Sequence, residues 1–117
     1  MPLFRRRSTP PALEGPPPED LVRDYLRGQN LEQVQDTDAA IEHYERAVGA
    51  GFDAAGPYDR LIYLYRAREA YADVVRVAEA AMSSVRTFDD KRQWFGQMRR
   101  EAHEALGRQS DSRGPEF

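Results

Sequence analysis

The sequence predicts a small all-α domain built from about five antiparallel helices. Between Asp20 and Leu106 the apolar residues recur at spacings of three and four, the pattern of a helix with one buried face. No segment there alternates with period two over more than four residues, and no Asn-Gly or Asp-Gly hairpin signal is present. Six of the eight prolines lie in the first eighteen residues, so that only Pro57 interrupts the helical region.

Capping residues delimit the first two helices. Glu19-Asp20 follows three prolines, and acidic side chains stabilise the positive end of a helix dipole, so a helix is expected to begin there. The run Asp36–Asp38 provides side-chain oxygens that cap the next helix. Gly49 and Gly51 suit its end, because glycine adopts the left-handed conformation found at many helix C-termini.

Later signals mark three more helices. Gly56-Pro57 suits a helix start, because proline costs nothing at the first helical position. Thr87 with Asp90 resembles a capping box for a last helix, which Gly107 is expected to end. The predicted helices cover residues 19–34, 37–49, 56–68, 71–85 and 88–106.

Two segments without apolar periodicity flank the helical region. Residues 1–18 are rich in proline and carry the basic run Arg5–Arg7, so we expect a disordered arm. Residues 19–106 are expected to form the folded helical domain described above. Residues 107–117 show no helical pattern, and we expect a disordered tail.

Composition excludes several classes of protein. The chain has 117 residues, a formal net charge of −3 and no cysteine, which leaves one small domain without disulfide or thiolate-metal sites. No stretch approaches the roughly 20 apolar residues of a membrane helix, and no apolar core follows Arg5–Arg7, so neither a membrane contact nor a signal peptide is expected. The negative charge gives no drive toward nucleic acid. We therefore expect a cytoplasmic protein, and the excess of arginine over the single lysine is typical of a high-GC bacterial genome.

A shift of the sequence by 34 residues superimposes the apolar positions of two helical regions. The register holds without a gap, and a double shift places Gly28 on Gly96. Small residues at Ala47 and Ala81 allow the two helices of a hairpin to approach closely. The superimposed positions are Ala40, Ile41, Tyr44, Ala47 and Val48 on Val74, Val75, Ala78, Ala81 and Met82.

These segments resemble a known family. The stretch DTDAAIEHYERAV resembles the second helix of a tetratricopeptide repeat, and PYDRLIYLYRAREAYADVVRVAEAAM resembles a nearly whole repeat. The resemblance covers residues 21–106, with two repeats and a closing helix whose Phe95 and Gly96 match the start of a third. Asp24 and Arg27 depart from the family's pattern, in which a bulky aromatic residue and a leucine are usual. The resemblance implies a right-handed solenoid of antiparallel helical hairpins with a concave groove.

In this family the groove binds a peptide or helix of another protein, so the resemblance implies a non-catalytic adaptor or scaffold. Tyrosine and arginine suit such binding, because tyrosine offers contact area at low entropic cost and arginine pairs with carboxylates. Chaperone-binding members clamp a C-terminal carboxylate, and their clamp residues are not matched here. The implied partner-binding residues are Tyr25, Gln29, Glu32, Asp59, Tyr63, Arg66, Gln93, Gln97 and Arg100.

Self-association is the alternative function. Repeat arrays generally need about three units to bury a continuous core, and two repeats with one helix leave ends to cover. We expect Phe95 to lie in the core, with Trp94 half exposed and Met98 beside it at the outer edge of the closing helix. A homodimer through Trp94 and Met98 would cover that edge.

The sequence contains no recognisable catalytic or metal-binding constellation. His43 has no second histidine one helical turn away, and His103 lacks a cluster of carboxylates, so both are expected on the surface. Paired acids fall at predicted helix starts, where capping explains them. We therefore expect no enzymatic activity, no cofactor and no metal.

Overall fold

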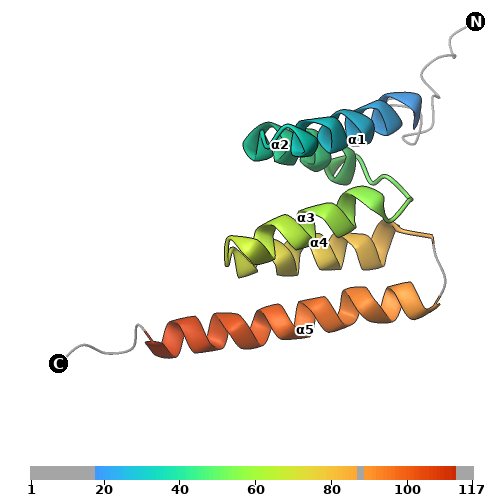
Figure 1. Cartoon of the computed structure of the whole chain (residues 1–117). Helices are drawn as coiled ribbons and strands as arrows, with labels where there is room; N and C mark the ends of the chain where they lie inside the picture. The colour runs from blue at the N-terminus through green and yellow to red at the C-terminus, as the bar shows by residue number, and fades with distance from the viewer. Residues whose placement is uncertain (1–17, 87–88, 113–117) are drawn as a thin grey trace, which may run out of the picture.

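The chain folds into α-helices joined by short connections (Figure 1). The computed structural model describes residues 18–86 and 89–112, and these contain five helices and no strand. The all-α prediction is confirmed, and the first four helices begin and end within one residue of their predicted positions. The helices are α1 (Pro18–Gln33), α2 (Thr37–Gly49), α3 (Gly56–Ala67), α4 (Tyr71–Ser84) and α5 (Asp89–Ser112).

The predicted end of the last helix at Gly107 is wrong, because α5 continues to Ser112. A glycine costs about 1 kcal/mol inside a helix, which is not enough to end one when the following residues favour helix. Residues 108–112 contain neither glycine nor proline, and Gln109 Nε2 donates to the backbone oxygen of Glu69, 3.3 Å away in the α3–α4 turn. The helix therefore covers the first part of the segment predicted as a tail.

Three predictions fall wholly or partly outside the described residues. The arm at residues 1–18 does so except for Pro18, the first residue of α1. The capping box does so because Thr87 and the side chain of Asp90 are not described. The same holds for residues 113–117 of the predicted tail.

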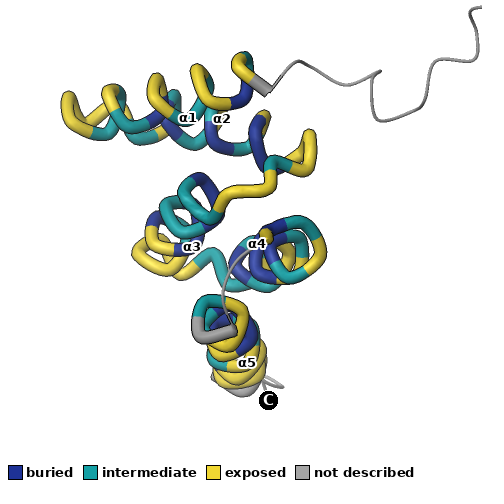
Figure 2. Tube along the Cα trace, turned by 90° about the vertical axis from the view of Figure 1, so that its right-hand side faces the viewer, coloured by how far each residue is buried: buried dark blue, intermediate teal, exposed yellow. Residues whose placement is uncertain are grey.

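The helices stack in chain order (Figures 1 and 2). α1 and α2 form the first hairpin, α3 and α4 form the second, and α5 closes the stack. Each helix packs mainly on its neighbours in the chain, and α5 packs chiefly on α4. Buried positions face neighbouring helices and exposed positions face outward, so one continuous core runs between the layers (Figure 2).

The 34-residue spacing of the sequence recurs in the backbone of the two hairpin turns. After α1, the amides of Gln35 and Asp36 donate to carbonyl groups in the last turn of the helix, at 2.9 and 2.8 Å. After α3, the amides of Glu69 and Ala70 do the same at 3.0 and 2.9 Å. Gln35 and Glu69 both have positive φ, at 66° and 57°. Since residues other than glycine rarely adopt this conformation, its recurrence at equivalent positions reflects a structural repeat.

The core is built from the repeated apolar positions. Ala47 and Ala81 are buried, as expected for contacts between closely spaced helices. Phe95 is fully buried as predicted, and Trp94 is partly buried at the edge of the core, with its ring centroid 5.3 Å from that of Phe95. The buried positions on α2 and α4 that share the 34-residue spacing are Ala40 with Val74, Tyr44 with Ala78, and Ala47 with Ala81.

Tyr44 packs directly on the backbone of α1 at Gly28. A Cβ atom added at Gly28 would lie 2.4 Å from Cε1 of Tyr44, well inside van der Waals contact. The Tyr44 side chain is fully buried, so its ring has no free space into which to move. Gly28 is therefore required by the space that the ring occupies.

Replacing Gly28 with alanine should lower the free energy of unfolding by about 1 to 3 kcal/mol, the usual cost of overpacking a core. Gly107→Ala is the matched control, because a Cβ atom there would meet nothing within 4 Å. That control should raise stability by up to about 1 kcal/mol through helix propensity alone. Urea unfolding followed by circular dichroism measures both, and equal effects of the two variants would contradict the proposed close packing.

Candidate functional site

A groove crosses α1, α3 and α5 on one face of the stack. Its central hollow has a volume of about 540 Å³ and lies between α3 and α5. A second hollow on the α1 side shares Arg60 with it, and a third along α5 shares Arg66 and Tyr71. The shared residues show that the three hollows are adjacent on this face. The charged and ring-bearing side chains that line the central hollow include Asp59, Arg60, Tyr63, Arg66, Lys91 and Trp94.

Five of the nine predicted partner-binding residues line this groove. Gln29 and Glu32 of α1 line the hollow on the α1 side. Asp59, Tyr63 and Arg66 of α3 line the central hollow. The helical spacing of these residues brings them to one face, as the sequence predicts.

Tyr25 lies elsewhere, because its ring packs inward. The ring centroids of Tyr25 and Tyr44 are 6.0 Å apart, and a Cβ atom at Gly56 would lie 2.5 Å from the Tyr25 ring. Tyr25 is therefore partly buried against the core and is absent from the lining of the three hollows.

The predicted groove residues on α5 also lie outside these hollows. Gln93, Gln97 and Arg100 are exposed, and the groove is instead lined by Lys91 and Trp94. α5 is therefore rotated about its own axis by about one residue position relative to the predicted orientation. This rotation arises because α5 packs chiefly on α4, with Phe95 in the core, which turns Trp94 toward α3.

Arg60 is held in the groove by a carboxylate from the first hairpin. Glu32 accepts hydrogen bonds from Nε and Nη2 of Arg60 at 2.8 and 2.5 Å, and a third from the hydroxyl of Tyr44 at 2.5 Å. The Arg60 guanidinium then lies over the ring of Tyr63, 4.6 Å from its centroid. The hydrogen bonds from Arg60 hold the pKa of Glu32 below its ordinary value, against the opposing effect of burial.

Lys91 joins α5 to α3 beside Trp94. Its Nζ lies 2.7 Å from Oδ2 of Asp59 and 4.0 Å from the centroid of the Trp94 ring. Oδ1 of Asp59 is buried, with no hydrogen-bond partner among the described residues. The Trp94 ring thus carries a cation over its face while its edge meets Phe95.

Arg66 has weaker contacts than Arg60. Its Nη2 is 3.4 Å from Oε1 of Glu101, and the two side chains are 47% and 42% exposed. Its Nη1 lies 3.2 Å from the sulfur of Met98. The expectation that Met98 forms an outer edge is wrong, because Met98 is 4% exposed and belongs to the core between α3, α4 and α5.

A second carboxylate joins the two hairpins outside the groove. Glu45 of α2 accepts hydrogen bonds from Arg76 of α4, at 3.1 and 2.6 Å, and from the hydroxyl of Tyr65 in α3. Partial burial raises the pKa of Glu45, and these hydrogen bonds lower it by more, so the net shift is downward. Burial and the bond to Glu45 together raise the pKa of the Tyr65 hydroxyl.

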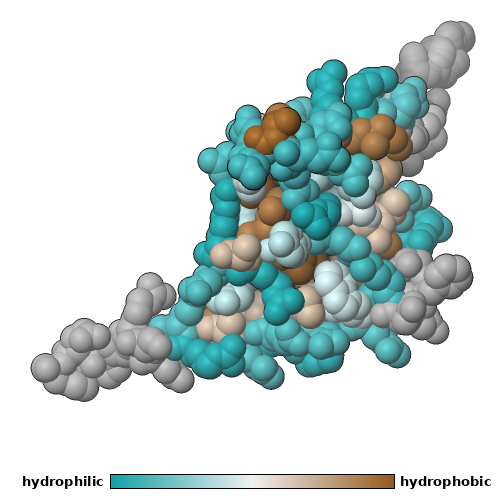
Figure 3. All heavy atoms as spheres, viewed as in Figure 1, coloured by the Kyte–Doolittle hydropathy of each residue, from teal (hydrophilic) through white to brown (hydrophobic). Residues whose placement is uncertain are grey.

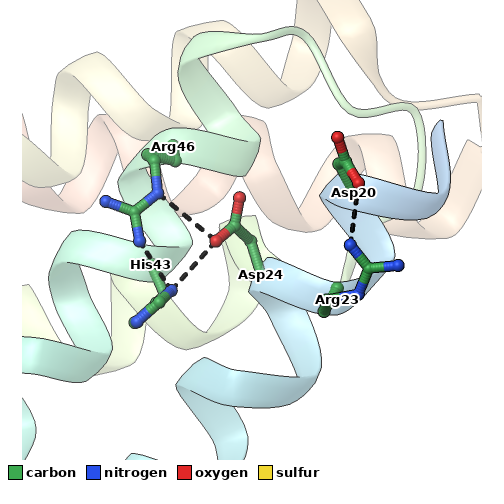
Figure 4. A network of polar contacts seen from close by, with 5 residues as sticks. All are labelled: Asp20, Arg23, Asp24, His43 and Arg46. Carbon is green, nitrogen blue, oxygen red and sulfur yellow. Dashed lines mark hydrogen bonds and ion pairs between the residues drawn. The ribbon is translucent and has the colours of Figure 1, made fainter. Parts of the chain in front are cut away.

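A third polar contact links α1 and α2 within the first hairpin (Figure 4). Oδ1 of Asp24 lies 2.9 Å from Nδ1 of His43 and 3.3 Å from Nε of Arg46. Partial burial raises the pKa of Asp24, and its hydrogen bonds with His43 and Arg46 lower it by more. Asp24 therefore joins α1 to α2 through ionic contacts. His43 lies in this contact and is only partly exposed.

The described residues contain no group of three or more histidine, cysteine, aspartate or glutamate side chains placed to hold a metal ion. None of the described helices combines the length and apolar character required to cross a membrane. No family model, curated protein or solved structure shows a significant match to the chain.

Acid should destabilise the fold. The pKa values of Asp24, Glu32 and Glu45 are lowered by folding, so the unfolded chain binds more protons as the pH falls. The free energy of unfolding should therefore decrease from about pH 5 downward, through the range in which unfolded carboxylates titrate.

Glu32→Gln should flatten this decline and lower stability at neutral pH, because one of the carboxylates is then absent. Glu42→Gln removes an exposed carboxylate from α2 and is the matched control, which should keep the wild-type slope. Urea unfolding at a series of pH values measures the slopes. A slope for Glu32→Gln as steep as that of the wild type would contradict this assignment.

Proposed function

We propose that the chain is a tetratricopeptide-like solenoid that binds a segment of another protein in the groove across α1, α3 and α5. Two observations support the solenoid. The turns after α1 and α3 repeat the same hydrogen bonds and the same positive φ at a spacing of 34 residues. The hairpins also stack in chain order, with buried residues at equivalent positions of α2 and α4.

The observation that carries the binding function is the exposure of Tyr63 within the groove. Its side chain is 60% exposed although it lies in the lining of the central hollow, which Trp94 also lines. A large aromatic ring left in water beside a second one is typical of an interface, where tyrosine, tryptophan and arginine contribute most of the binding energy. The guanidinium of Arg60 holds the Tyr63 ring in this position.

Combining Tyr63→Ala with Arg66→Glu should reduce capture of a partner by at least about tenfold, as expected for two hot-spot residues. The experiment is a pull-down from a lysate of the source organism, followed by titration of the purified partner. Gln97→Ala with Arg100→Glu also truncates one side chain to alanine and reverses one arginine charge, at exposed α5 positions outside the hollows, and this control should bind normally. Equal loss in both double variants would contradict a binding site in this groove.

Self-association is a second candidate, and the surface of α1 favours it more than α5 does. Val22 and Leu26 of α1 are 43% and 50% exposed, and Val34, in the turn directly after α1, is 72% exposed. They are spaced at multiples of four residues. Hydrophobic patches also lie over the upper end of the molecule, where α1 and α2 lie, whereas the α5 end is mainly hydrophilic (Figure 3). A second copy covering this apolar stripe would remove it from water.

If α1 mediates self-association, Leu26→Lys should lower the molar mass to that of a monomer. Light scattering during size-exclusion chromatography measures this directly. Ser83→Lys adds the same charge at an exposed position of α4 and should leave the mass unchanged. A wild-type chain that is already monomeric at high concentration would exclude this candidate.

A cytoplasmic location and a bacterial origin stay predictions from composition.

A further inference from the structure

We infer that the groove takes an acidic segment carrying one aromatic side chain, which enters the central hollow between Tyr63 and Trp94. This inference rests on the proposed function and specifies the chemistry of its ligand. It is carried by the two rings of the lining and by the unequal strength of the ion pairs around them.

Each cation of the central hollow is paired with a carboxylate. The lining contains Arg60, Arg66 and Lys91 and the single carboxylate of Asp59, which pairs with Lys91. Glu32 and Glu101, which pair with Arg60 and Arg66, line the neighbouring hollows. An acidic segment therefore binds here by replacing one of these carboxylates, and the question is which pair is weak enough to exchange.

The ion pairs differ in how easily a ligand can replace them. The Arg60 pair is two-pronged with bonds of 2.5 and 2.8 Å, and Nζ of Lys91 lies 2.7 Å from Asp59. Arg66 approaches Glu101 only to 3.4 Å, and both side chains are close to half exposed. An exposed pair of this kind contributes little, so a carboxylate of the ligand can displace Glu101. Arg60 and Lys91 instead keep the two rings in place.

The rings of Tyr63 and Trp94 indicate the second feature of the ligand, its aromatic side chain. Arg60 lies over Tyr63, and Lys91 lies over Trp94, so each ring is oriented by a cation. Both rings line the same hollow, whose volume of about 540 Å³ is in the range of sites that bury small ligands. An aromatic side chain from the partner would contact both rings at once and gain pairwise aromatic contacts in addition to buried area. Arg66, three residues after Tyr63 on α3, then meets an acidic residue next to that side chain.

Trp94 is the only tryptophan of the chain, so its fluorescence reports directly on the central hollow. The full chain is titrated with three short peptides that contain no tryptophan. The first has one phenylalanine flanked by glutamates, the second has one phenylalanine flanked by lysines, and the third has alanine in place of phenylalanine between glutamates. The first should bind at least about tenfold more tightly than each of the others.

Charge reversal supplies the matched test. In Arg66→Glu the order of the two phenylalanine peptides should invert, because the exchangeable cation has become a carboxylate. Arg66→Gln should only remove the preference, and Arg86→Glu, an exposed position outside the lining, should retain it. Circular dichroism and the urea midpoint of each variant show whether it is folded, and the inverted order is a readout that simple unfolding cannot produce.

Tighter binding of the lysine peptide to the wild type, or equal binding of the alanine and phenylalanine peptides, would overturn the inference. Equal binding of all three peptides would also overturn the inference, although it would show that the groove binds peptides. Absence of a response to all three would also overturn it, and the lysate experiment with Tyr63→Ala and Arg66→Glu would then judge the proposed function separately.

Discussion

The contact between the Tyr44 ring and the bare backbone at Gly28 is the constraint on which the rest of the structure depends. It places the Tyr44 hydroxyl where it donates to Glu32, and Glu32 in turn holds the guanidinium of Arg60. Arg60 then fixes the ring of Tyr63 in the groove. A steric requirement inside the first hairpin is thereby transmitted to a surface position on the second.

The ion pairs between the layers of the stack contribute geometry more than stability. Exposed pairs in proteins are worth less than about 1 kcal/mol, and several of those between the hairpins are partly exposed. Their effect is to set how each layer is turned relative to the one before it, because a two-pronged contact such as Arg60 with Glu32 tolerates few orientations. Burial of the apolar core drives folding, and these ion pairs determine which orientation of the packed helices is adopted.

Most helix boundaries could be predicted because their signals are local. Asp36 caps α2 through the amide of Ala39, Gly51 has positive φ after α2, and Pro57 lies in the first turn of α3. The end of α5 could not be predicted from Gly107, since a tertiary contact extends the helix. Gln35 and Glu69 gave no signal either, because neither residue type favours the left-handed conformation that it adopts.

The groove residues on α3 could be predicted because helical spacing is a local signal that brings them to one face. The groove residues on α5 could not be predicted. The orientation of α5 depends on its packing against α4, which no spacing within α5 specifies. The pairing of Arg60 with Glu32 joins residues far apart in the chain and has no local pattern at all. The adjacent pair Trp94-Phe95 was the one available signal, because two large rings in succession cannot both point into the same core.

The packing of each helix mainly on its neighbours in the chain also determines how the molecule assembles. Most contacts join helices that are neighbours in the chain, so the contact order is low and folding should be fast for a domain of this size. A nucleus that forms in either hairpin can propagate outward to its neighbours. Loss of structure would follow the reverse course, with the α1–α2 hairpin, which meets the rest of the molecule chiefly through α3, separating before α5 leaves α4.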